Sequence, residues 1–269
     1  MNEWKGTSSP VNWCSDQVGL CTRTMWPRGQ WGNHRMPLEP VLPGRCNAGS
    51  LKDAERVSRT RCPAFCGLGC QFPVDKPNLG TQMQAAGIKW RSYQESMGTP
   101  CKLSGAGPYA PKHDPFLYFT DMQKGANNLC ANTNVDYTQF AADLAAGTYP
   151  FSFITPNLTS DGHDPSTDPV AALKTSDAWA KTEIDKIMAS NAYKNGGVIF
   201  ITWDEAEGRN GDSADQVPMI VVTPGIKSPG YKSNVAYSHA NYLATVEDIF
   251  GLPRLGAAVG KASMKEFWQ

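Results

Sequence analysis

The chain of 269 residues and 29.3 kDa carries 25 basic and 25 acidic residues, so its formal net charge is zero. That length suffices for one large α/β domain or two small ones with a proper hydrophobic core. The balanced charge gives no electrostatic basis for binding nucleic acid or an anionic membrane.

The balance hides a break in composition near residue 70. Residues 1–70 hold seven of the ten Arg and six of the eight Cys, with nine basic against five acidic residues, a net +4. Residues 71–269 carry sixteen basic against twenty acidic residues, a net −4. We therefore predict an atypical, poorly ordered Cys-, Arg- and Trp-rich segment over 1–70 and a single α/β domain over 71–269.

The cysteines and the N-terminus point to different compartments. Eight Cys suggest an oxidising environment. Residues 1–10 nevertheless lack the apolar stretch of a signal peptide, and no run reaches the roughly 18 apolar residues of a transmembrane segment. A zinc site using Cys62, Cys66 and Cys70 is the weaker alternative, because no His follows at ligand spacing.

From residue 78 onward the pattern is that of an α/β domain. A short helix is predicted to end at Gly87 and to run into a strand over 88–93. Another helix is predicted over 137–146, stopped by Gly147. The short apolar run over 151–155, closed by a proline, is typical of a buried strand.

The later part of the chain continues this alternation. Near-helical spacing of apolar residues over 168–190 predicts a long amphipathic helix packed on a sheet; these residues are Val170, Leu173, Trp179, Ile184, Ile187 and Met188. The runs 198–202 and 217–222 suggest strands covered on both faces, and the order strand, helix, strand favours parallel crossovers. Ser238 is expected to cap a helix that Gly251 ends.

Polar side chains follow three predicted strands at their carboxyl ends, where functional groups gather in open α/β sheets. These side chains are Asn157, Asp161, His163 and Asp164 after the first strand, Asp204 and Glu205 after the second, and His239 beyond the third. Carboxylates and imidazoles that converge at one edge favour a hard-cation site. Alternatively, Asp204 and Glu205 merely begin a solvated loop.

Two of the histidines, His163 and His239, have two interpretations each. His163 could be a general acid or an anion donor, or a loop histidine bonded to neighbouring carboxylates. His239, in the first turn of a helix, could ligate a metal or act as an acid, or serve as a second capping residue. His113 lies in a proline-bounded loop and is the least specific by itself.

An ordered set of motifs resembles one known family. The motifs are Phe-Ile-Thr-Trp-Asp-Glu at 200–205, Val-Pro-Met-Ile-Val-Val-Thr-Pro-Gly at 217–225, the segment 237–253, Tyr-Ala-Pro-Lys-His-Asp-Pro-Phe at 109–116, and the segment 153–164. Together they resemble the phosphoesterase family of acid phosphatases and non-specific phospholipases C, in its acid phosphatase branch, over about residues 73–260. The resemblance implies an alkaline-phosphatase-like α/β sandwich whose mostly parallel central sheet is flanked by helices.

The resemblance also implies one phosphate-binding pocket with assigned roles: Asp204 and Glu205 as ligands of a divalent metal ion of unknown identity, Asn157 and Asp161 on the substrate side, and His113, His163 and His239 as catalytic histidines. The cation would neutralise phosphoryl charge while a histidine protonates the leaving alcohol. The implied reaction is metal-assisted hydrolysis of a phosphoric monoester through a covalent phosphoryl-enzyme. The substrate is then a phosphorylated small molecule or lipid, and phospholipase C chemistry on a diester is the alternative.

Two further expectations come from the same resemblance. Cys101 and Cys130 are expected to form a disulfide that closes a loop of about thirty residues, in a secreted protein, and two buried thiols are the alternative. The family's N-terminal strand, with its Glu-Asn metal motif, nucleophile and His-Pro-Ser segment, has no counterpart in residues 1–70, so the nucleophile stays unassigned and the fold is expected to be incomplete at the N-terminus. An inactive, truncated or mispredicted chain is therefore the hypothesis of a different class.

Overall fold

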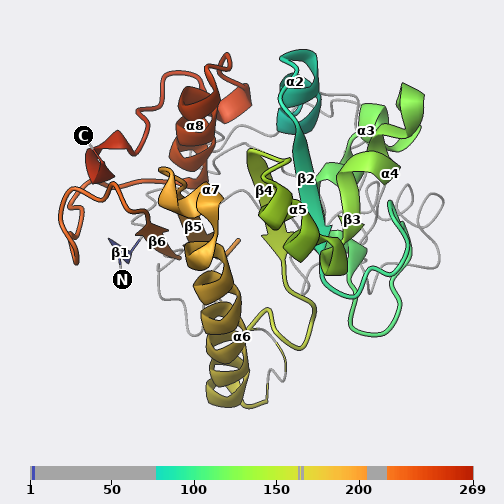
Figure 1. The fold of residues 1–269 in the computed structure, drawn as a ribbon, viewed down its shortest axis with the longest axis horizontal. Helices are drawn as coiled ribbons and strands as arrows, with labels where there is room; N and C mark the ends of the chain where they lie inside the picture. Colours follow the sequence, from blue (N-terminus) through green and yellow to red (C-terminus); the bar gives the residue numbers. More distant parts are fainter. Residues whose placement is uncertain (1, 4–76, 163, 165–166, 205–216, 269) are drawn as a thin grey trace, which may run out of the picture.

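The computed structural model describes residues 2–3, 77–162, 164, 167–204 and 217–268 (Figure 1). Almost all of the segment predicted to be atypical, residues 1–70, lies outside this range, as do His163 and Glu205. The described part is an α/β structure with two three-stranded sheets. Among its helices, none is both long and apolar enough to cross a membrane.

The first sheet is parallel throughout and contains two of the predicted strands. Its order is β3-β2-β4, with β2 at Trp90–Gln94, β3 at Asn134–Asp136 and β4 at Phe151–Thr155. β2 pairs with β4 over five residues, from Trp90 opposite Phe151 to Gln94 opposite Thr155. The carboxyl ends of all three strands therefore meet at one edge, as expected for strand-end chemistry.

The second sheet corrects the prediction of parallel crossovers. β5 (Ile199–Thr202) and β6 (Pro218–Val222) are antiparallel neighbours, and β1 (Asn2–Glu3) pairs antiparallel with β6. The expected single, mostly parallel sheet is thus wrong for this half of the described structure. The long helix precedes β5, and antiparallel neighbours need no crossover helix between them.

The predicted helices are confirmed with small shifts at their ends. The helical segments are α2 (Leu79–Ala85), η3 (Pro111–His113), η4 (Pro115–Tyr118), α3 (Thr120–Lys124), η5 (Ala126–Asn128), α4 (Leu129–Thr133), η6 (Tyr137–Gln139), α5 (Phe140–Ala146), α6 (Pro169–Ala189), α7 (Asn191–Lys194), α8 (His239–Phe250), η7 (Gly256–Ala258) and η8 (Lys265–Phe267). Caps explain the boundaries. At the start of α8 the Ser238 N–H donates to Asn241 Oδ1 at 3.0 Å, and Gly251 ends the helix at φ 65°.

Helix α6 is anchored at its middle and its C-terminal part, not along a complete apolar stripe. Trp179 lies 5.9 Å from the Tyr137 ring, and Ile187 packs on the cluster around Tyr93. Val170 is nevertheless 60% exposed and Leu173 54% exposed, so the prediction that these residues pack on a sheet is wrong. In Figure 1 this end of α6 extends away from the sheets.

Helix α8 joins the hydrophobic clusters of the two sheets. Val246 belongs to the cluster of α2, β2, η4 and α3, which also contains Met83, Trp90, Phe116, Phe119, Met122 and Leu252. The second cluster contains Val217, Met219, Tyr237, Met264 and Phe267. Tyr242 packs against both clusters, so α8 fixes the β5/β6 sheet relative to the parallel sheet. The N-terminus of α8 is where His239 lies.

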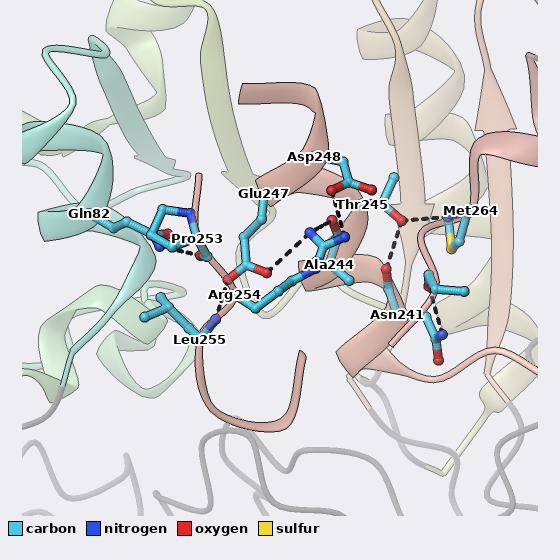
Figure 2. A network of polar contacts seen from close by, with 11 residues as sticks. Gln82, Asn241, Ala244, Thr245, Glu247, Asp248, Pro253, Arg254, Leu255 and Met264 are labelled. Atoms are coloured by element: carbon cyan, nitrogen blue, oxygen red, sulfur yellow. Dashed lines mark hydrogen bonds and ion pairs between the residues drawn. The ribbon is translucent and has the colours of Figure 1, made fainter. Parts of the chain in front are cut away.

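The C-terminal end of α8 is held by a buried carboxyl group, Glu247 (Figure 2). Its Oε1 accepts the Leu255 N–H at 2.7 Å, and its Oε2 lies 3.5 Å from Arg254 Nη1. The Arg254 guanidinium also reaches Asp248 at 2.6 Å. Burial raises the pKa of Glu247 to about 7, although Leu255 and Arg254 partly oppose this.

The expected disulfide between Cys101 and Cys130 is present, with a sequence separation of 29. It ties the loop after β2 to helix α4, so that the His113 segment lies within the closed loop. In the chain-entropy model a loop of this length stabilises the fold by about 3 to 4 kcal/mol.

The raised pKa of Glu247 makes stability depend on pH. Between its ordinary pKa of 4.5 and about 7, the unfolded chain ionises Glu247 while the folded chain keeps it protonated. The free energy of unfolding is therefore expected to fall as pH rises through this window, and Glu247→Gln should reduce that fall by about 2 kcal/mol. Urea unfolding at pH 4.5 and pH 7.5 measures this fall in the free energy of unfolding.

Asp248→Asn is the matched control on the same helix. Asp248 contacts the same arginine, but the hydrogen bond from Arg254 lowers the pKa of Asp248, so its contribution is lost only at more acidic pH. The control should therefore keep the parent's slope between pH 4.5 and pH 7.5. An identical slope in the parent and in Glu247→Gln would contradict the assignment.

Candidate functional site

Two residues predicted for the same pocket, His113 and Asp161, lie together in the structure. His113 Nδ1 is 3.7 Å from Asp161 Oδ2, and both side chains are mostly shielded from solvent. His113 is the last residue of η3, whereas Asp161 lies in the loop after β4. A carboxylate at this distance stabilises a protonated imidazole electrostatically, which suits a group that binds an anion or delivers a proton.

Hydrogen bonds near the end of β4 align the loop that carries Asp161 with the segment that carries His113. Leu158 N–H donates to Pro108 O at 2.9 Å, and Thr155 Oγ1 donates to His113 O at 3.4 Å. Asp161 N–H in turn donates to Asn157 O at 2.9 Å, which folds the loop back on itself. The register of β4 in the sheet thus determines where Asp161 meets His113.

Asn157, predicted on the substrate side, has its side chain engaged within this loop. Its Oδ1 accepts the Thr159 N–H at 2.9 Å, and its Nδ2 donates to Ser96 Oγ at 3.0 Å. The first bond is an Asx turn, in which a short amide side chain organises the backbone two residues ahead. Asn157 therefore shapes the loop that carries Asp161.

A buried carboxyl group that the sequence analysis did not select lies next to His113. Asp114 is fully buried, and its Oδ1 accepts from the Phe116 N–H at 3.2 Å and from Ser92 Oγ at 3.3 Å. Its Oδ2 has no hydrogen-bond partner among the described residues. Burial raises the pKa of Asp114 to about 7, with partial opposition from these two donors. The sequence feature that could have pointed to Asp114 is its position between two short turns that each begin with a proline.

The second group of predicted residues lies at the end of β5 and the start of α8. The buried His239 donates from Nε2 to Trp203 O at 2.9 Å, because a carbonyl oxygen can only accept. Burial lowers the pKa of His239, while Trp203 and the nearby Asp204 oppose that shift. The structure thus brings His239 and Asp204 into one neighbourhood, while their roles stay predictions.

The segment that leads into α8 is fixed by a further carboxylate, Glu266. It accepts hydrogen bonds from the hydroxyls of Tyr237 at 2.7 Å and Tyr231 at 3.1 Å, and from Ser233. Although burial opposes it, these donors together lower the pKa of Glu266. They hold the backbone just before His239.

Gly162 connects the two groups of residues. It follows Asp161 and adopts φ 92°, a region that residues with a Cβ rarely occupy. A Cβ at this position would lie 3.6 Å from Trp203 Nε1 and 3.5 Å from Ser176 Oγ on α6. The loop after β4 therefore passes beside Trp203 at the end of β5, so the segment that carries Asp161 lies next to the segment that carries Asp204.

The described residues do not complete a metal site by themselves. Among them, no three His, Cys, Asp or Glu side chains approach closely enough to hold a metal ion. Asp204 offers one carboxylate, whereas Glu205 and His163 lie outside the described residues. Hard divalent cations require about six oxygen donors, so Asp204 and His239 cannot hold one without further ligands.

An α/β fold that gathers imidazoles and carboxylates beyond its strand ends is typical of enzymes acting on charged substrates. The family model described as "Phosphoesterase family" matches residues 70–253, and the chain belongs to that family. The match includes every described site residue discussed above except Glu266.

Curated relatives carry phosphatase names. The chain is 28% identical to "Phosphatidylinositol-3-phosphatase" of Mycobacterium tuberculosis, over 79% of this chain and 63% of the relative. It is 26% identical to "Probable acid phosphatase" of Kluyveromyces lactis, over 72% of this chain and 47% of the relative. It is 27% identical to "Acid phosphatase" of Aspergillus fumigatus, over 69% and 42%. The chain thus spans less than two thirds of the length of these relatives.

A substitution of Asp114 tests whether burial raises the pKa of this carboxyl group beside the site. Because the pKa of Asp114 is raised from its ordinary 3.8 to about 7, the unfolded chain ionises this group first, and the free energy of unfolding falls as pH rises through this window. Asp114→Asn resembles the protonated acid, so we expect little change in stability at pH 4 and a gain of about 2 to 4 kcal/mol over the parent at pH 8. Denaturant unfolding at both pH values measures the effect.

Asp136→Asn is the matched control, since Asp136 also caps a 3₁₀ helix. Burial acts against its ionisation, but the bonds from the Gly98 N–H and from Thr138 lower its pKa overall. This substitution should therefore destabilise the chain at pH 8 and have less effect at pH 3. If both variants lose stability at pH 8, the proposed environment of Asp114 is wrong.

Proposed function

We propose that this chain hydrolyses phosphoric monoesters in the manner of an acid phosphatase. The observation that supports it most is the closeness of Gly162 to Trp203, where an added Cβ would lie 3.6 Å from the indole Nε1, because it places the loop of Asp161 beside the segment that carries Asp204 in a phosphoesterase chain. Phosphoryl transfer depends mainly on positioning and on electrostatic stabilisation of the phosphoryl oxygens. Imidazoles and carboxylates on adjoining walls are suited to both tasks.

The residues of this chain would have different roles in the reaction. Asp161 would hold the His113 imidazolium in place, so that His113 donates a hydrogen bond to a phosphoryl oxygen on the substrate side. His163, two residues beyond Asp161, is the proposed general acid that protonates the leaving alcohol. His239 is proposed as the third catalytic histidine, on the wall that carries Asp204. Asn157 would keep the substrate-side loop in shape, and the nucleophile stays unassigned.

A divalent cation is part of the proposal. Asp204 and Glu205 would supply carboxylate oxygens to it, and its remaining ligands would have to come from beyond the described residues. When bound, such a cation neutralises charge on phosphoryl oxygens and activates a nucleophile.

A phosphorylated lipid is the second candidate substrate. The relative named "Phosphatidylinositol-3-phosphatase" supports it, since that name describes a monoester of a lipid headgroup. Secretion is also proposed, because fungal relatives are named acid phosphatases and a Cys101–Cys130 disulfide persists best in an oxidising compartment.

Hydrolysis of p-nitrophenyl phosphate and phosphatidylcholine by the purified chain tests the reaction. We expect phosphate release from the monoester, with kcat/KM reduced at least about 100-fold by His113→Gln and by Asp204→Asn. Bound divalent metal, measured by mass spectrometry, should fall in Asp204→Asn but not in His113→Gln.

Asp185→Asn provides the matched control for the change at Asp204. Asp185 is exposed on α6, where it pairs only with Lys181 among the contacts described for it, so activity and metal content should remain at the parent's level. Activity on phosphatidylcholine alone would favour the phosphodiesterase alternative. Absence of hydrolysis of either ester would support an inactive chain.

A further inference from the structure

Glu95, the residue just after β2, binds two different elements with its two carboxylate oxygens. Oε2 accepts the backbone N–H of Asn157 at 2.9 Å. Oε1 accepts Trp179 Nε1, on α6, at 3.1 Å. The Glu95 N–H also donates to Thr155 O at 3.0 Å. One half-buried side chain thus connects the end of β2, the loop after β4 and helix α6.

The neighbouring Ser96 reinforces the same connection. Its φ of 66° lies in the left-handed region, which is unfavourable for a residue with a Cβ and persists where surrounding contacts enforce it. Its Oγ accepts Asn157 Nδ2 at 3.0 Å. Backbone and side chain of Asn157 are therefore both fixed by consecutive residues of the β2 end.

The connection extends to the proposed phosphate side of the site. Asn157 O accepts the N–H groups of Ser160 at 2.8 Å and Asp161 at 2.9 Å. Asp161 then faces His113. The path from Glu95 to His113 consequently passes through two residues of one loop, Asn157 and Asp161, by two hydrogen bonds of 2.9 Å and one ion-pair contact of 3.7 Å.

We propose that Glu95 is a positioning residue for phosphoester hydrolysis: through Asn157 it holds Asp161 against His113, and through Trp179 it docks α6 beside the same loop. This role rests on the proposed function. A carboxylate suits it because both partners are N–H donors and an ionised carboxylate only accepts. Glutamine would direct its own NH₂ group at one donor and leave that donor without an acceptor.

Hydrogen exchange at single amides tests the positioning without relying on activity. The Asn157 amide should be protected in the folded parent and exchange at least about 10-fold faster in Glu95→Ala, which removes both acceptor oxygens. Trp179→Phe removes only the other bond and should leave the exchange of this amide unchanged. An Asn157 amide that exchanges in the parent as fast as an exposed loop amide overturns the proposal, even if Glu95→Ala does not fold.

Kinetics on p-nitrophenyl phosphate test the consequence for the reaction. Glu95→Gln should lower kcat about 10-fold with a smaller change in KM, because misplaced reacting groups affect the transition state more than substrate binding. Tyr137→Phe is the control, since the Tyr137 hydroxyl holds the same helix through Glu183 without touching the loop. An equal loss of kcat in Tyr137→Phe overturns the positioning role.

Failure of the proposed function gives a different pattern. A parent chain that hydrolyses no phosphoester, yet shows a protected Asn157 amide released by Glu95→Ala and not by Trp179→Phe, contradicts the reaction and supports the anchoring of the loop. A parent that hydrolyses the ester and whose Glu95→Gln variant retains full kcat contradicts the positioning role alone.

Discussion

The parallel pairing of β2 with β4 is the constraint on which the described site depends. Because these strands run in register from Trp90 to Gln94, the residues that follow both of them emerge at the same edge of the sheet. Glu95 thereby reaches Asn157, and the loop after β4 can turn back until Asp161 meets His113. A shift of one residue in this pairing would send every side chain of β4 to the opposite face.

The second wall of the site is attached to the first through α8 and Gly162. Tyr242 packs on the apolar clusters of both sheets, while Gly162 allows the loop after β4 to lie against Trp203. Neither sheet holds all of the predicted site residues by itself. The relative position of the two groups of candidate residues therefore depends on sheet-to-sheet packing as much as on strand order.

Buried carboxyl groups give this fold an acidic preference. Asp114 next to the site and Glu247 in α8 both have raised pKa values of about 7, so the folded state favours their protonated forms. Hydrogen bonds lower the pKa of Asp136 and of Glu266, so these two carboxylates favour the folded state as pH rises, but over a more acidic range. We therefore expect the folded state to be more stable at mildly acidic pH than at neutral pH.

Local patterns in the sequence predicted the elements well, and long-range relations poorly. The apolar run of β4 and the capping residues of α8 are local patterns of a few residues, so the bounds of both elements were predictable. β3 is only three residues long and was missed, because so short a strand carries no recognisable period. The antiparallel arrangement of β5 and β6 depends on pairing between distant segments, which residue order alone did not reveal.

The same distinction applies to the site. The imidazoles and carboxylates were selected because their residue types follow predicted strands, and the family's motifs supported the choice. Glu95 was missed because its partners lie 62 and 84 residues further along the chain. Asp114 was passed over because its burial results from the packing of the turns around it.

An NMR titration with inorganic phosphate tests most directly whether the two walls form one phosphate site. A single site predicts that the Gly162 amide and the Trp203 indole N–H shift together, with the same dissociation constant, because these groups lie where the walls meet. Shifts confined to one wall, or two different dissociation constants, would contradict a single shared site.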